Sequence, residues 1–237
     1  MKYSGGLVKK EREQIFKLFA ENTKLKFNEI EKAIKIRSNM VSYHLEKMQE
    51  EGLLEKKDDY YYLTKKAERY LPIIPHITGQ ELSPLPVVLV AVLHKDKILL
   101  IKRSKRPYQN YWCLIGGKMK MEETFGATAK RVVKEKAGID AKYDRMASVL
   151  YERVEGEDII KHSFIHFFVL MQAENAEFKQ SESGTLKWFN IKDLDKEKII
   201  PSDIWLIKNK LNSSIEVIDS EMKENKGKLS EFRVLKQ

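Results

Sequence analysis

The chain has 237 residues, 42% of them hydrophobic and 33% charged, a composition that fits two modest domains, each with its own apolar core. The single cysteine excludes an intramolecular disulfide and a cysteine-rich zinc cluster, and no apolar run reaches the roughly 18 residues that span a bilayer. The net charge of +9 suits a polyanion such as nucleic acid or a phosphorylated small molecule. We therefore expect a cytoplasmic protein with no membrane partner.

Prolines mark the expected boundary between two domains. Four of the six lie between residues 72 and 86, together with Gly79 and Ser83, and such a segment continues neither a helix nor a central strand. We expect a first domain over residues 1–75, a proline-rich linker over 76–86 and a second domain over 87–237.

The first domain begins with a helical pattern. Apolar stripes at Ile15–Phe19 and Ile30–Ile34 predict two helices, and Ser38 is a good N-cap for a third. The apolar side chains within Val41–Met48 fall on one face of that third helix, and Gly52 is its natural end.

A short β-hairpin is expected next. Leu53–Glu55 and Tyr60–Leu63 form its strands, with a polar turn between them. Thr64 then caps a further helix that ends near Leu71. The first domain is therefore predicted to contain three helices, a hairpin and a further helix.

This order of elements and the segment Ser38–Leu54 closely resemble a winged helix-turn-helix domain, over about residues 8–71. The resemblance implies that the third helix enters the major groove of double-stranded DNA. Polar residues opposite its apolar face are the candidate DNA contacts: Asn39, Ser42, Tyr43 and Lys47. His44 points inward, which favours a packed structural histidine. The alternative is a protein-interaction module, because the turn of the wing carries Asp58 and Asp59.

The second domain begins with a buried hairpin, Val87–Leu93 and Ile98–Ile101. A motif with fixed spacing follows, and its members are Gly117, Glu123, Arg131, Val133, Glu135, Gly138 and Ile139. They are similar to the Nudix box, Gly-x5-Glu-x7-Arg-Glu-U-x-Glu-Glu-x-Gly-U with U aliphatic. The resemblance implies a Nudix-type α/β/α sandwich with a mixed sheet and a C-terminal helical tail, which makes the whole chain α+β.

The resemblance also implies a reaction. Members of the family cleave a pyrophosphate linked to a nucleoside or similar group, with divalent cations held by helix glutamates. Two of those glutamate positions are here Val132 and Lys136, beside Glu135, and an ammonium near the cation position repels a metal. For an active enzyme the candidates are Glu135 and Glu123 for catalysis and Glu135, Glu122 and Glu182 for Mg²⁺. Arg131 is expected to pair structurally with Glu123 or Glu135.

Basic residues are the candidate contacts to a phosphorylated ligand: Arg103, Arg106 and Lys136. Lys136 is expected to pair with a pyrophosphate in place of the lost cation. Cys113 lies among apolar neighbours and is expected to be buried. His162 and His166 alternate with apolar residues, which favours partly solvated strand histidines without a catalytic role.

These features favour a DNA-binding transcriptional regulator whose altered Nudix domain senses a nucleotide-like phosphorylated ligand. A homodimer is expected, because one winged helix contacts too few base pairs for specificity in a genome. The alternative is an active Mg²⁺-dependent Nudix hydrolase of nucleoside diphosphate derivatives with an accessory winged helix. A third hypothesis is a protein-interaction scaffold without enzymatic activity.

Overall fold

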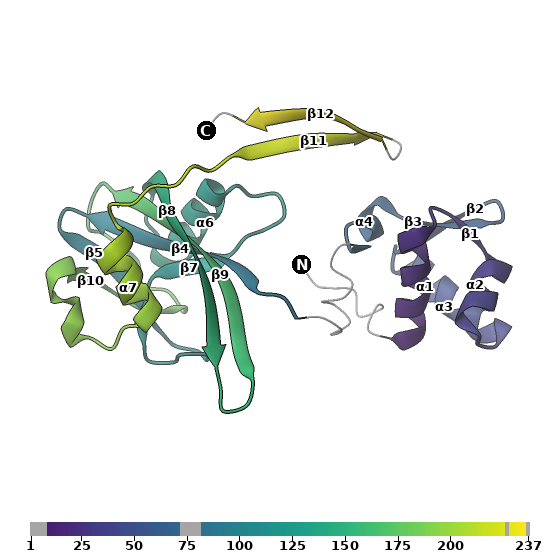
Figure 1. Ribbon diagram of the computed structural model, residues 1–237, viewed down its shortest axis with the longest axis horizontal. Helices are drawn as coiled ribbons and strands as arrows, with labels where there is room; N and C mark the ends of the chain where they lie inside the picture. Colours follow the sequence, from purple (N-terminus) through teal and green to yellow (C-terminus); the bar gives the residue numbers. More distant parts are fainter. Residues whose placement is uncertain (1–8, 72–81, 226–227, 236–237) are drawn as a thin grey trace. The chain divides into compact units, whose positions relative to one another are not determined.

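The computed structural model describes residues 9–71, 82–225 and 228–235. The chain divides after Ser83 into two compact units, which we describe separately (Figure 1). This division lies within the predicted linker, most of which falls outside the described residues. The second unit's first strand begins at Leu85, two residues before the expected domain start. No helix in the described ranges is long and apolar enough to cross a membrane.

The first unit has the predicted order of helices followed by a hairpin. Its elements are α1 (Lys10–Glu21), β1 (Leu25–Lys26), α2 (Phe27–Ile34), α3 (Ser38–Glu50), β2 (Leu54–Lys57), β3 (Tyr60–Leu63) and α4 (Lys65–Glu68). The sequence did not predict β1, which joins the hairpin in an antiparallel sheet of order β1-β3-β2. The expected helix after the hairpin is shorter than predicted.

The ends of α3 and α4 test the capping predictions. Thr64 caps α4 as expected, with its hydroxyl accepting a hydrogen bond from Ala67 N–H at 3.2 Å. Gly52 follows α3 with φ +69, the left-handed conformation that suits glycine. The predicted N-cap role of Ser38 is wrong, because α3 already begins at this residue and its hydroxyl donates to Glu31 instead.

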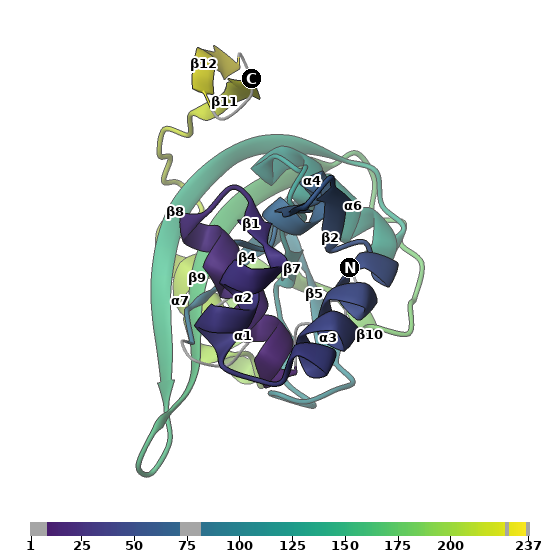
Figure 2. The ribbon, with the colours of Figure 1, turned by 90° about the vertical axis from the view of Figure 1, so that its right-hand side faces the viewer.

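The second unit is built on a mixed sheet of seven strands. Its strands are β4 (Leu85–His94), β5 (Lys97–Arg103), β6 (Trp112–Cys113), β7 (Ile115–Lys118), β8 (Ala141–Glu155), β9 (Ile160–Ala173) and β10 (Gly184–Asn190). The main order is β10-β5-β4-β9-β8, with β6 paired to β5 and β7 to β4. Only β4 and β9 run parallel among these pairs, which confirms the mixed sheet. Figure 2 shows β8 and β9 as one long curved hairpin.

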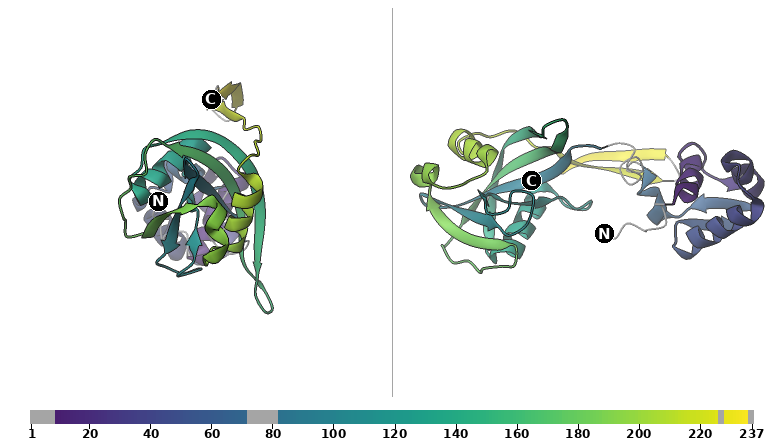
Figure 3. Two further views of the ribbon diagram at one scale, coloured as in Figure 1. Left: turned by 90° about the vertical axis from the view of Figure 1, so that its left-hand side faces the viewer. Right: turned by 90° about the horizontal axis from the view of Figure 1, so that it is seen from below.

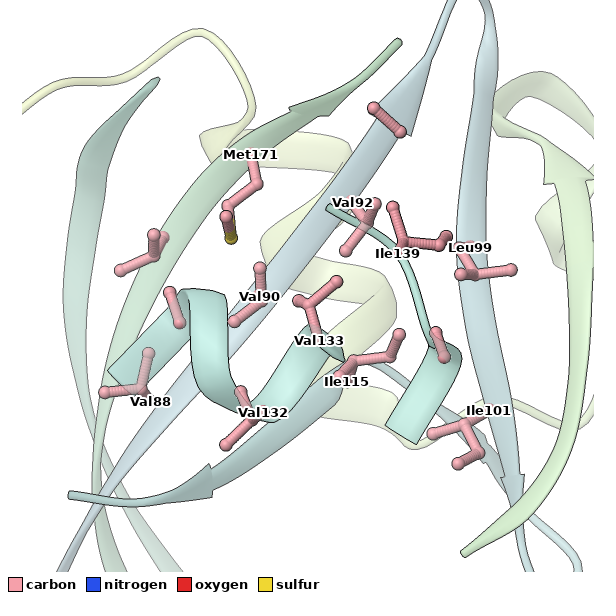
Figure 4. Packing of buried hydrophobic residues seen from close by; sticks show 14 of the residues in the cluster. Val88, Val90, Val92, Leu99, Ile101, Ile115, Val132, Val133, Ile139 and Met171 are labelled. Atoms are coloured by element: carbon pink, nitrogen blue, oxygen red, sulfur yellow. The ribbon is translucent and has the colours of Figure 1, made fainter. Parts of the chain in front are cut away.

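Apolar residues cover both faces of this sheet. On one face Val88 and Val90 pack with Val132 and Val133 of α6 (Phe125–Ala137) (Figure 4). On the other face the apolar side chains of β4 pack with Leu206 of α7 (Pro201–Lys210). Figure 3 shows the ribbon of α7 beside the sheet. The alternation of inward and outward residues along β4 therefore gives the three-layer arrangement that the resemblance implied.

The end of the second unit differs from the expected helical tail. After the 3₁₀ helix η3 (Ile191–Lys196) and α7, the chain forms β11 (Asp219–Asn225) and β12 (Lys228–Leu235). These two strands pair antiparallel with each other and join no other sheet in the described residues. Apolar and charged residues alternate in Phe232–Val234, a period of two that favours a strand over a helix.

Candidate functional site

The exposed face of α3 carries the residues predicted to contact DNA. Asn39 and Tyr43 are exposed, while Ser42 and Lys47 are half-buried. Lys47 forms an ion pair with Glu50 at 2.5 Å, and this hydrogen bond raises the pKa of the lysine. Three of the four candidates therefore present neutral polar groups for base edges, and the fourth shares its charge with a carboxylate.

Four lysines near the wing were not among the predicted contacts. Lys24 and Lys26 lie over the ring of Tyr60, with Nζ at 4.4 Å and 5.0 Å from its centroid. Lys56 and Lys57 are exposed on β2. Lys26, Lys56 and Lys57 lie in the small sheet and Lys24 directly precedes it, so these cations offset the negative charges of Glu55, Asp58 and Asp59.

The second unit contains a cavity of about 640 Å³, a size typical of small-molecule sites. Its floor is the face of β4 that carries Val87 and Leu89, and α7 contributes Ser202 and Asp203. Four basic side chains are among the lining residues, and we call the part of the wall that they form the cationic end: Arg103, Lys105, Lys118 and Lys136. The predicted contact Arg106 is exposed and is not among the residues that line this cavity, so its role in ligand binding stays a prediction.

Lys136 reaches the cavity from the penultimate position of α6. Its Nζ donates a hydrogen bond to the carbonyl oxygen of Gly116 in β7. Burial lowers the pKa of this lysine, with a smaller lowering by Arg103 and an opposing effect of Glu135. A short strand and a helix thus fix an ammonium group in the wall of the cavity, at a position where the family has a glutamate.

The predicted catalytic pair is engaged elsewhere. Arg131 donates from Nε and Nη2 to the two carboxylate oxygens of Glu123, at 2.5 Å and 2.7 Å, and Thr128 donates to the same carboxylate at 2.8 Å. These bonds, above all those from Arg131, lower the pKa of Glu123 to about 2. Arg131 also contacts Glu135 at 3.2 Å. The expected structural role of Arg131 fits this geometry, but neither Glu123 nor Glu135 lines the cavity.

Val132, at the other altered position, belongs to the core. It is 1% exposed and lies on the opposite side of α6 from solvent, against Gly117. The two substitutions therefore have different surroundings, although the spacing placed both beside Glu135. Val132 supports the helix and only Lys136 changes the charge of the cavity.

The residues present do not fit the expected Mg²⁺ site. Of the three candidates, Glu182 lines the cavity, whereas Glu122 and Glu135 do not. Among the described residues no three His, Cys, Asp or Glu side chains are placed to hold a metal ion. The ammonium of Lys136 lines the same cavity, and a divalent cation near it would be repelled.

The wall of the cavity formed by β8 and β9 was missed by the sequence reading. We call it the β9 wall, and it consists of Glu152, His162, Phe164 and His166. His166 is buried, with Nε2 3.5 Å from Glu152, and this contact lowers the pKa of Glu152. His166 is therefore buried and not partly solvated as expected, whereas His162 is half-buried as expected, and both line the cavity. The pairing of β9 with β4 brings the histidines and Phe164 beside the cavity floor, and the pairing of β8 with β9 adds Glu152.

Two buried groups complete the cavity. Asp203 accepts a hydrogen bond from the backbone N–H of Leu114 at 2.7 Å, and burial raises its pKa to about 7. Cys113 is buried as expected, and burial raises the pKa of its thiol to about 12. The thiol is therefore inert as a nucleophile at neutral pH.

Each of the two units is similar to a known protein family. The family described as "NUDIX domain" matches residues 83–208, and "Bacterial regulatory protein, arsR family" matches residues 9–56. The chain is 40% identical over 74 residues to the "ADPR responsive transcriptional repressor NtrR" of Acinetobacter baylyi, covering 28% of this chain and 30% of that protein. It is 26% identical over 109 residues to the "Uncharacterized Nudix hydrolase YvcI" of Bacillus subtilis, covering 46% and 67%. The chain thus spans about a third of the repressor's length.

Among solved structures, one similar fold is the Nudix domain of Shewanella oneidensis NrtR, described as complexed with ADP ribose. It has a TM-score of 0.49 and 19% identity, and the match covers 62% of this chain and 96% of that one. Another is a MutT Nudix hydrolase from Burkholderia pseudomallei, with a TM-score of 0.48 and 22% identity, covering 54% and 98%.

Proposed function

The chain belongs to the Nudix family, and from this premise we propose that it is a transcriptional regulator that binds DNA through its first unit and senses a nucleotide-like ligand through its second. The ligand carries a pyrophosphate or similar group and is bound without being cleaved. Lys136 is the observation that carries this proposal, because it places a fixed cation where the family holds a metal-binding carboxylate.

The charge of Lys136 decides between sensing and hydrolysis. A metal ion about 4 Å from an ammonium would be destabilised by roughly 1 to 4 kcal/mol per unit charge at surface-like dielectric. The same ammonium, together with Arg103 and Lys118, attracts phosphate oxygens directly. Without a metal the site has a means to hold a pyrophosphate but none of the family's means to activate water.

The first unit supports the DNA-binding part. The arsR match covers α1 to α3 and part of the hairpin, and α3 presents polar side chains opposite its buried face. The name of the Acinetobacter relative describes a repressor that responds to ADP-ribose, so ADP-ribose is the first ligand to test. We propose that ligand binding changes the separation of two recognition helices in a homodimer.

The decisive experiment measures binding and turnover in parallel. Calorimetry of the full chain with ADP-ribose, ADP and inorganic pyrophosphate in EDTA should show binding, and the same ligands with Mg²⁺ should show no release of phosphate or AMP. Lys136→Met should abolish the metal-free binding, whereas the matched control Lys134→Met, on the same helix but paired with Asp140 outside the cavity, should not. Hydrolysis at ordinary enzymatic rates in Mg²⁺ would contradict the ligand-sensing proposal and favour an active hydrolase.

The DNA-binding and dimer proposals need a separate test. Selection from random duplexes should enrich one motif, and retention should weaken steeply with salt. Light scattering should give twice the mass of 27.8 kDa. A protein without salt-dependent DNA affinity would favour an interaction scaffold, and a monomer at high micromolar concentration, with and without DNA, would contradict the dimer.

A further inference from the structure

The two ends of the cavity differ in chemistry. The register of the sheet pairs Lys118 of β7 with Val87 of β4, and Val87 with His166 of β9. Phe164 of β9 pairs with Glu152 of β8. The β9 wall therefore lies on the other side of β4 from Lys118 of the cationic end, on the same face of the sheet. A ligand with a phosphate at the cationic end has its other part beside the β9 wall.

The β9 wall contains a row of aromatic rings. The rings of Phe164 and His166 are stacked with centroids 5.2 Å apart and planes 25° apart, and His162 lies 6.0 Å from Phe164. Tyr108 closes this row with its ring edge toward His162 at 6.2 Å. Such a row favours a planar aromatic group of a ligand over a sugar or an alkyl chain, because ring faces stack.

Two buried polar atoms of this region have no hydrogen-bond partner within the described part of the chain. His166 is 8% exposed, yet its Nδ1 has no hydrogen-bond partner among the described residues, and the same holds for the buried Oη of Tyr108. Buried polar atoms normally find a partner in the protein or in a bound molecule. Glu152 contributes a carboxylate that its contact with His166 keeps ionised, and a carboxylate in that state only accepts hydrogen bonds.

We propose that the β9 wall recognises the nucleobase of the ligand, and that it selects a base with an exocyclic amino group, which donates to the carboxylate of Glu152. The inference rests on the proposed function, since it presumes a phosphorylated ligand at the cationic end. The base stacks on Phe164, and the unpartnered atoms of His166 and Tyr108 face its remaining polar edge.

The test compares ligands that differ in one group. ADP and purine riboside 5′-diphosphate differ only by the amino group, and inorganic pyrophosphate lacks the base altogether. Calorimetry of the full chain in EDTA should give ADP an affinity about tenfold or more above that of purine riboside diphosphate, because the latter lacks the amino group that donates to Glu152. ADP should also exceed pyrophosphate by at least that factor.

Two variants locate the effect. Glu152→Gln should reduce the preference for ADP over purine riboside diphosphate to about twofold, since a neutral amide accepts more weakly than a carboxylate. Phe164→Leu should weaken both nucleotides alike. Neither variant should lower the affinity for pyrophosphate, and should Glu152→Gln fail to fold, the comparison on the unmodified chain and on Phe164→Leu still decides.

The outcomes separate this inference from the proposed function. Binding of pyrophosphate with no gain for ADP, or equal affinities for ADP and purine riboside diphosphate, overturns the β9 wall as a base site and leaves the phosphate sensor intact. Absence of binding for pyrophosphate and both nucleotides overturns the proposed function itself. A preference for ADP that Glu152→Gln leaves unchanged overturns the assignment to Glu152.

Discussion

Gly117 and Val132 lie so close together that a Cβ atom placed on Gly117 would be 2.5 Å from Cγ1 of Val132. The valine side chain fills the space that the glycine leaves open, between α6 and β7. In the family's motif this position is a glutamate, so the loss of the carboxylate is at the same time a gain of core packing. Restoring the acid therefore has a structural cost that the spacing of the motif does not reveal.

We predict that Val132→Glu destabilises the second unit. A carboxylate 1% exposed among apolar residues lacks a partner, and the expected loss in the free energy of unfolding is on the order of 3 to 5 kcal/mol at pH 7. Chemical denaturation followed by circular dichroism measures it. Val132→Ala is the control, with a loss of about 2 kcal/mol that does not vary with pH, whereas the loss for Glu should shrink in acid. Equal losses at all pH values would mean that the acid finds a partner or reaches solvent.

The charge reversal Lys136→Glu should make the binding of pyrophosphate depend on Mg²⁺. It replaces the ammonium beside Gly116 with a carboxylate in the same cavity as Glu182. Metal-free binding of pyrophosphate should fall by at least about tenfold, and weaker binding that depends on Mg²⁺ should appear. Calorimetry with and without EDTA measures both. Unchanged metal-free binding would show that the side chain does not contact phosphate.

Two substitutions in the first unit should have different effects on DNA binding. Asn39 is exposed at the start of α3, and Asn39→Ala should cost about 1 to 3 kcal/mol on the selected site while relaxing the preference at one base pair. Lys57 is exposed on the wing, and Lys57→Gln should weaken all sequences alike and lower the salt slope by about one. Fluorescence anisotropy at several salt concentrations separates the two patterns. If both variants changed sequence preference and salt dependence in the same way, Asn39 of α3 would not recognise a base.

The sequence predicted what local patterns encode. The period of Val41, Leu45 and Met48 indicated the buried face of α3, and all three are buried. The motif spacing indicated α6, which ends at Ala137 before the left-handed Gly138. These features depend on neighbours within a few residues, so a pattern in the sequence suffices to find them.

The cavity depends on contacts that no local pattern encodes. Asp203 in α7 meets the backbone of Leu114, and His166 meets Glu152 through strand pairing. A sequence pattern also does not predict the direction of a long side chain. Lys136 lines the cavity, whereas Arg106, which was expected to bind ligand, is exposed and is not among its lining residues. Sequence reasoning thus found the cationic end in part and missed the β9 wall.

Asp203 should make the second unit less stable as the pH rises. Burial raises its pKa from 3.8 to about 7, so the folded chain keeps a proton that the unfolded chain has released between these values. Stability from this group is therefore fully present below about pH 4 and is lost as the pH rises through 7, by up to about 4 kcal/mol.

Asp203→Asn keeps an oxygen that can accept the hydrogen bond from the Leu114 N–H and removes the titration. Its thermal unfolding temperature should exceed that of the unmodified chain at pH 8 and approach it at pH 5. Glu197→Gln changes an acid to an amide at a residue outside the cavity and is the control. Its unfolding temperature should depend on pH in the same way as that of the unmodified chain. Parallel unfolding curves for Asp203→Asn and the unmodified chain across this range would mean that Asp203 is already ionised in the folded protein.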